Sequence, residues 1–119
     1  MTDLVACVSA GGKGALLHVS KLAVDMEWSN IFLIGDKEAK DSFVCIKSFN
    51  FILIDKEKTI SELKEHIKKS LDGKISDSEV AVNLVSGSGK EHMALLSALL
   101  NLGLGIRLMI LTKEGIKEI

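Results

Sequence analysis

The sequence has no long hydrophobic run and no excess of one charge, and these absences narrow its possible functions. No apolar stretch reaches the roughly 20 residues that span a bilayer, and Met1-Thr2-Asp3 lacks the basic start of a signal peptide. The formal net charge is −1 and the lysines are spread along the chain, so there is no basic stripe for a long nucleic acid. We expect no membrane partner, no long nucleic-acid partner and a cytoplasmic location.

The chain has only two cysteines and three histidines, and none has the spacing of metal ligands. Cys7 and Cys45 both lie in apolar runs, which is typical of small core residues in a reducing compartment. Glu62 stands one turn before His66, but such a pair is common on helix surfaces. The sequence therefore predicts no metal site, and we expect no cofactor.

Five short apolar runs divide the chain. Runs of this length suit parallel strands, because both faces of such strands are covered and must be apolar. With 119 residues, the chain fits a single domain over residues 1–119. The predicted strands are Leu4–Val8, Ile31–Ile34, Phe51–Ile54, Val80–Val85 and Ile106–Leu111.

Apolar residues at helical spacing lie between these runs and predict covering helices. Thr59 and Glu62 can form a capping box at the start of one helix, and Gly73 would end it. A short helix is expected from Glu38 to Ile46, with Phe43 and Ile46 turned inward. The inward faces of the two longer helices are Ala15, Val19, Leu22 and Met26, and Ile60, Leu63, Ile67 and Leu71.

The alternation of strands and helices predicts an α/β fold, a Rossmann-like open parallel sheet of strand order 3-2-1-4-5 with helices on both faces. Ligands of such sheets bind beyond the carboxyl ends of the strands, where the strand order reverses. Glycine-rich loops follow the first strand, over Ser9–Gly14, and the fourth, over Ser86–Lys90. Each loop opens a helix, so free N–H groups, the helix dipole and a lysine would attract an anion there. The candidate ligand-binding residues are Ser9, Gly11, Gly12, Lys13, Ser86, Gly87, Ser88, Gly89, Lys90 and His92.

Other interpretations of these loops fit less well. A P-loop needs a glycine where Leu84 stands and a magnesium-binding hydroxyl where Glu91 stands. A dinucleotide fingerprint has a different glycine spacing, although Asp36 follows the second strand where a ribose-binding acid would lie. The glycines could also simply make short turns. Two similar loops after strands predicted to be adjacent favour a shared ligand site.

The helix expected from His92 to Leu102 is apolar on nearly all sides. A sheet covers only one side of a helix, so the other side is predicted to meet a second copy of the chain about a two-fold axis. We therefore expect a homodimer.

The segment Asn83-Leu84-Val85-Ser86-Gly87-Ser88-Gly89-Lys90, followed at Met93 by an apolar helix, resembles the signature of CRISPR-associated Rossmann-fold (CARF) domains. In that signature, asparagine ends a strand and Thr-Gly-Gly-Thr-Lys opens the next helix. The chain has Ser88 in place of a glycine and Gly89 in place of a hydroxyl residue. The resemblance implies a homodimer that binds a cyclic oligoadenylate, the second messenger of type III CRISPR antiviral defence, across its two-fold axis.

Three functions remain open on this basis. Only Lys113–Ile119 follows the last predicted strand, so we expect a stand-alone member that binds the messenger. The first alternative is a metal-independent ring nuclease, in which the resemblance would assign Lys90 to stabilise the phosphate and Ser9 to orient the attacking 2′-hydroxyl. Such a reaction needs mainly alignment and charge neutralisation, because the ligand supplies its own nucleophile. The second alternative is a regulatory or structural dimer with no nucleotide ligand.

Overall fold

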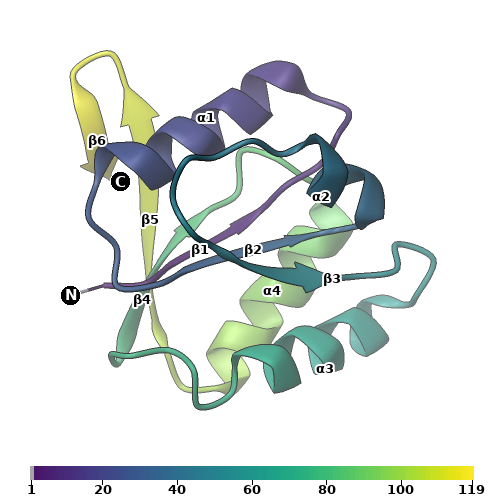
Figure 1. Ribbon diagram of the computed structural model, residues 1–119. Coiled ribbons are helices and arrows are strands. Elements are labelled where there is room, and N and C mark those ends of the chain that lie inside the picture. Colours follow the sequence, from purple (N-terminus) through teal and green to yellow (C-terminus); the bar gives the residue numbers. More distant parts are fainter. Residues whose placement is uncertain (1) are drawn as a thin grey trace.

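The computed structural model describes residues 2–119, in which one sheet is covered by helices on both faces (Figure 1). The sheet contains six strands, and four helices alternate with the first five of them. In chain order the elements are β1 (Leu4–Cys7), α1 (Lys13–Asp25), β2 (Ile31–Gly35), α2 (Lys37–Ser42), β3 (Asn50–Leu53), α3 (Ile60–Leu71), β4 (Glu79–Asn83), α4 (Gly89–Asn101), β5 (Gly105–Thr112) and β6 (Gly115–Glu118).

The strand order is β3-β2-β1-β4-β5-β6, and the first five strands are parallel to one another. This is a Rossmann-like α/β fold, and it confirms the predicted order of the first five strands. The sixth strand was not predicted. It returns antiparallel to β5 through a hairpin in which Thr112 pairs with Gly115. The strand order reverses between β1 and β4, which places the ligand-binding edge of such a sheet at the ends of these two strands.

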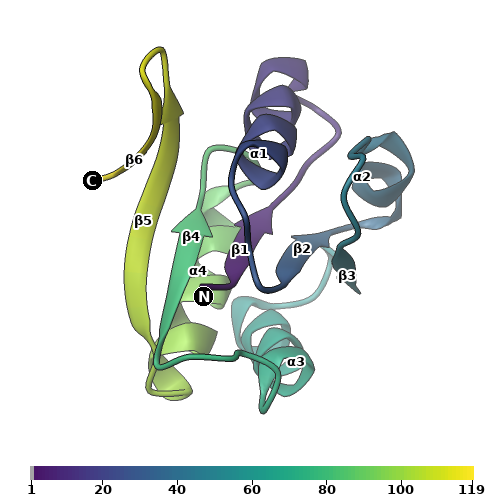
Figure 2. The same ribbon diagram turned by 60° about the vertical axis from the view of Figure 1, so that its left-hand side comes forward.

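Alternating side chains of the strands form one hydrophobic core on each face of the sheet, as the two-residue period of a strand requires. In β1, Leu4 and Ala6 face the core beneath α1, whereas Val5 and Cys7 face the core beneath α3 and α4. Figure 2 shows the sheet from a second side, with α1 and α3 on opposite faces. Both faces of β1 are therefore buried, which explains its uninterrupted apolar sequence.

Helix α3 begins and ends as its sequence predicts. The Thr59 backbone N–H donates to Glu62 Oε1 at 3.1 Å, and the Glu62 N–H donates to Thr59 Oγ1 at 3.2 Å, so the capping box is formed. Gly73 follows the helix with a φ of +75°, a conformation that glycine adopts without steric cost. Leu63, Ile67 and Leu71 are buried, whereas Ile60 is exposed, contrary to the prediction.

The short helix between β2 and β3 ends earlier than predicted. Helix α2 stops at Ser42, and Phe43 already has an extended backbone conformation. Phe43 is buried as expected. Because the helical period has ended, Ile46 does not share the face of Phe43; it is 88% exposed, and the prediction for Ile46 was wrong. Met26 is likewise exposed, because α1 ends one residue before it.

Candidate functional site

The two glycine-rich loops meet at the carboxyl edge of the sheet. β1 pairs directly with β4, in a register that places Ala6 beside Asn83. Beyond the strands, the backbone N–H of Ser9 donates to Ser86 Oγ at 2.9 Å. Ser86 is buried, so its hydroxyl joins the two loops and does not project into solvent. The loops therefore converge at the point where the strand order reverses.

The loop after β4 is held in one conformation by close packing. Gly87 has a φ of +95°, in the left-handed region that favours glycine. A Cβ atom at this position would lie 3.0 Å from Cys7 Cβ and 3.2 Å from His92 Nε2. His92 Nε2 donates to the Ser86 carbonyl oxygen at 2.7 Å, so the histidine ring fixes the loop from the first turn of α4. The candidate residues Ser86, Gly87 and His92 thus form one rigid turn.

A buried carboxylate lies at the start of α4. Glu91 Oε1 accepts hydrogen bonds from the Ser88 N–H at 2.9 Å and from Ser88 Oγ at 3.2 Å. Among the described residues, the buried Glu91 Oε2 has no hydrogen-bond partner. Burial, together with the negative charge of Glu91, raises the pKa of the Cys7 thiol to about 12, so this thiol stays protonated. The N–H groups of Gly89 and Lys90 belong to the first helical turn, where no helical carbonyl accepts them.

The lysines of the two loops take different directions. Lys13 is the first residue of α1 and is exposed. Lys90 Nζ donates to the backbone carbonyl of Lys56 at 2.7 Å, so its side chain extends toward the loop between β3 and α3. The ammonium group of Lys56 in turn lies 3.4 Å from Asp36 Oδ2. The loops after β2, β3 and β4 are therefore connected along the same edge.

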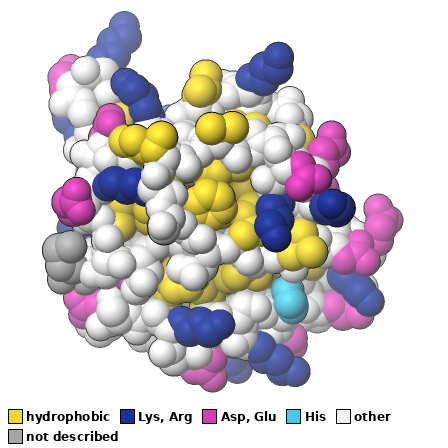
Figure 3. Space-filling model, in the orientation of Figure 1, with side chains coloured by type: hydrophobic (Ala, Val, Ile, Leu, Met, Phe, Trp, Pro, Cys, Tyr) yellow, Lys and Arg dark blue, Asp and Glu magenta, His cyan; other side chains and the backbone are white. Residues whose placement is uncertain are grey.

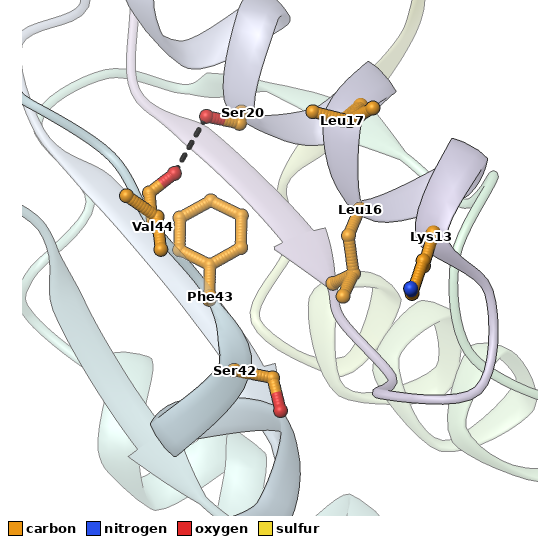
Figure 4. Close-up of a pocket in the computed structure, with 7 residues that line it drawn as sticks. All are labelled: Lys13, Leu16, Leu17, Ser20, Ser42, Phe43 and Val44. Carbon is orange, nitrogen blue, oxygen red and sulfur yellow. Dashed lines mark hydrogen bonds between the residues drawn. The ribbon is translucent and has the colours of Figure 1, made fainter.

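An apolar groove of about 260 Å³ adjoins Lys13 (Figure 4). It lies between α1 and the segment Ser42–Val44, and the ring of Phe43 lies between Val44 and Leu16 in the close-up. The Ser20 hydroxyl donates to the Val44 carbonyl at 2.7 Å, which fixes one wall. Hydrophobic side chains are visible at the centre of this face in the space-filling view (Figure 3). The groove therefore places an apolar surface beside Lys13, at the end of the loop that follows β1.

The structure brings part of the predicted set into one cluster and leaves the rest at its margin. Ser9, Ser86, Gly87 and His92 are connected by hydrogen bonds or packing. The exposed residues of the set are Gly11, Lys13, Ser88 and Gly89, and Gly12 and Lys90 are half-buried. The sequence interpretation missed Lys56, because the segment from Asp55 to Thr59 contains no glycine and has the composition of an ordinary charged loop.

No protein-family model and no curated protein matches the chain. Within residues 2–119, no three His, Cys, Asp or Glu side chains lie close enough together to hold a metal ion. Over the same range, every helix is too short or too polar to cross a membrane.

Proposed function

We propose that the protein is a homodimer that binds a cyclic oligoadenylate at its two glycine-rich loops, as a component of type III CRISPR antiviral defence. The observation that carries this proposal is the hydrogen bond from the Ser9 N–H to Ser86 Oγ, because it brings both loops to one place. The resemblance of the segment from Asn83 to Lys90 to CARF domains supplies the ligand class.

The chemistry of this edge suits phosphodiester groups. Two helices, α1 and α4, begin at the loops, and the N–H groups of their first turns attract anions. Lys13 and Lys90 add positive charge close to these helix starts. The apolar groove beside Lys13 supplies a surface on which an adenine ring can pack. The helix starts could thus bind the phosphate of a nucleotide while the adjoining apolar groove binds its base.

The outer face of α4 supports the homodimer. Met93 is 59% exposed and Leu100 is 65% exposed, and both lie on the side of α4 that faces away from the sheet. The neighbouring strand β5 adds Leu108, which is also exposed. Met93 is only three residues after Lys90, so a two-fold axis at this face would bring the loops of two copies near each other. A cyclic ligand with repeated nucleotides would then contact equivalent loops from both copies.

Binding, and not cleavage, is the activity proposed. His92 is the obvious general base of the candidate set, and its Nε2–H donates to the Ser86 carbonyl, so Nδ1 is the ring nitrogen that could accept a proton. Lys90 Nζ is engaged with the Lys56 carbonyl. A ring nuclease would need Lys90 to be released from this contact.

Isothermal titration calorimetry with cyclic tetra-adenylate and cyclic hexa-adenylate tests the proposal. We expect binding of one ring size at one ligand per two chains. Lys90→Ala should weaken binding, because an ammonium–phosphate contact is lost. Absence of heat with both ligands, at tens of micromolar protein, would overturn the proposal and favour the dimer without a nucleotide ligand.

Product analysis in EDTA separates binding from turnover. Intact cyclic ligand after prolonged incubation agrees with a binding module. Linear or 2′,3′-cyclic fragments that disappear in Lys90→Ala would instead identify the ring nuclease.

A further inference from the structure

Two lysines connect three loops at the carboxyl edge of the sheet. Lys90 Nζ donates to the Lys56 carbonyl at 2.7 Å, which ties the start of α4 to the loop between β3 and α3. Lys56 Nζ lies 3.4 Å from Asp36 Oδ2, which ties that loop to the residue following β2. Lys56 is therefore a neighbour of the candidate site, although it lies outside both glycine-rich loops.

Asp36 holds Lys56 from a fixed position. Its other oxygen, Oδ1, accepts a hydrogen bond from the Ala39 N–H at 2.9 Å and so caps α2. The carboxylate is thereby anchored by the helix, and the ammonium group of Lys56 is oriented toward this edge. The contact is an exchangeable one, because the side chains are 42% and 25% exposed and water screens their attraction.

The carboxylates of Asp36 and Glu91 lie at this edge and oppose an incoming phosphate. A cation in addition to Lys13 and Lys90 would therefore favour anion binding. A phosphate oxygen forms a stronger charge-assisted hydrogen bond with an ammonium group than a backbone carbonyl does. Lys90 can therefore exchange the Lys56 carbonyl for a phosphate, and Lys56 can exchange Asp36.

We propose that Lys56 is an additional anion-binding residue of this site. In the absence of ligand, Lys56 forms an ion pair with Asp36, and a polyanionic ligand replaces the Asp36 carboxylate as its partner. This inference rests on the proposed function, because it assigns Lys56 to the same ligand. It also narrows the ligand class. Lys13, Lys56 and Lys90 start from three separate loops, so a chain of several phosphates uses them better than a single phosphate does.

Three variants test the inference by calorimetry with cyclic tetra-adenylate, cyclic hexa-adenylate and inorganic tripolyphosphate. Lys56→Met should weaken binding about five- to tenfold, the effect of one lost charge-assisted contact. Asp36→Asn should strengthen binding by a similar factor, because asparagine still caps α2 but no longer competes for Lys56. The matched control is Lys58→Met, which removes the same charge from the same exposed loop and should change binding less than twofold.

The outcomes separate this inference from the proposed function. If the wild-type protein binds a cyclic oligoadenylate but Lys56→Met and Lys58→Met behave alike, the role of Lys56 is refuted while the proposed function stands. If only tripolyphosphate binds, and only Lys56→Met weakens it, Lys56 is an anion-binding residue and the oligoadenylate proposal is refuted. If the wild-type protein binds none of the three probes, both are refuted.

Discussion

Asn83 Nδ2 lies 3.1 Å from His18 Nε2, and this contact joins β4 to α1 at the end of the β4–β5 ladder. The last residue pair of that ladder is Val82 with Leu108, whereas β5 continues to Thr112. Beyond the ladder, Asn83 Nδ2 donates to the Met109 carbonyl at 2.8 Å, and His18 Nε2 accepts from the Leu111 N–H at 3.3 Å. Beyond the end of β4, the side chains of Asn83 and His18 thus take the place of a strand backbone as hydrogen-bond partners of β5.

This arrangement predicts a pH-dependent stability. His18 Nε2 faces two N–H donors, so the ring must be unprotonated there, and burial lowers the pKa of His18 below its usual 6.5. As pH falls below 6.5, the unfolded chain takes up a proton before the folded chain does. The free energy of unfolding should therefore be highest above pH 6.5 and decrease until the folded-state pKa is passed. Urea unfolding at intervals from pH 7.5 to 4.5 measures this change.

The control for His18 is His18→Gln, which can keep an acceptor oxygen but has no titrating group. The difference between the wild-type and variant unfolding free energies should be constant above pH 7 and should change below pH 6.5. A constant difference across the whole range would show that His18 does not titrate on unfolding.

Gly87 and Gly89 lie two residues apart and should respond in opposite ways to alanine. Gly87→Ala forces a side chain into the left-handed region against Cys7 and His92, and we expect a loss of about 1–3 kcal/mol in stability. Gly89 is helical, and a Cβ atom at this position would have no neighbour within 4 Å, so Gly89→Ala should be neutral or stabilising by up to about 1 kcal/mol. Thermal unfolding of the two variants measures both effects. Equal stability of the two would contradict the rigid turn described for this loop.

The site can be located from the sequence because its main signal is local. Glycine clusters after the first and fourth apolar runs indicate the two loops, and a Rossmann-like strand order then requires them to be neighbours. The hydrogen bond from Ser9 to Ser86 agrees with that expectation. The contact of Lys90 with Lys56 could not be foreseen, because it depends on how far the crossover from β3 to α3 reaches along the edge.

Ser86 and Ser9 differ in what their side chains contribute. Ser86→Ala removes the acceptor of the Ser9 N–H in a buried position, so it should cost about 1–3 kcal/mol and increase hydrogen exchange in the Ser9–Gly14 loop. Ser9→Ala keeps the N–H donor, and its stability should stay within about 0.5 kcal/mol of the wild type. Urea unfolding and amide hydrogen exchange check the pair. If Ser9→Ala were as destabilising as Ser86→Ala, the backbone hydrogen bond would not be the main link between the loops.

The outer face of α4 is expected to hold the homodimer together. Leu100→Glu places a charge in the apolar patch and should convert the dimer to a monomer of 12.9 kDa. Leu17→Glu is the matched control, because Leu17 is 69% exposed on α1, which covers the other face of the sheet. Light scattering after size-exclusion chromatography gives the mass of each. A wild-type monomer, or dissociation caused by Leu17→Glu instead, would contradict this interface.

Two structural features were not visible in the sequence for physical reasons. Strand β6 has only four residues, Gly-Ile-Lys-Glu, and its pattern is too short to separate a strand from an irregular tail. Helix α2 ends without a proline or glycine signal, so the helical spacing of Ile46 from Phe43 suggested burial, although the helix has already ended at Ser42.

Amide NMR during a titration with cyclic tetra-adenylate, and in parallel with cyclic hexa-adenylate, tests the central claim most directly. If the two glycine-rich loops form one binding site, the amide signals of Ser9–Gly14 and Ser86–Lys90 will shift together and yield the same dissociation constant. Shifts in one loop alone, shifts confined to other parts of the chain, or no shifts with either ligand would contradict the claim.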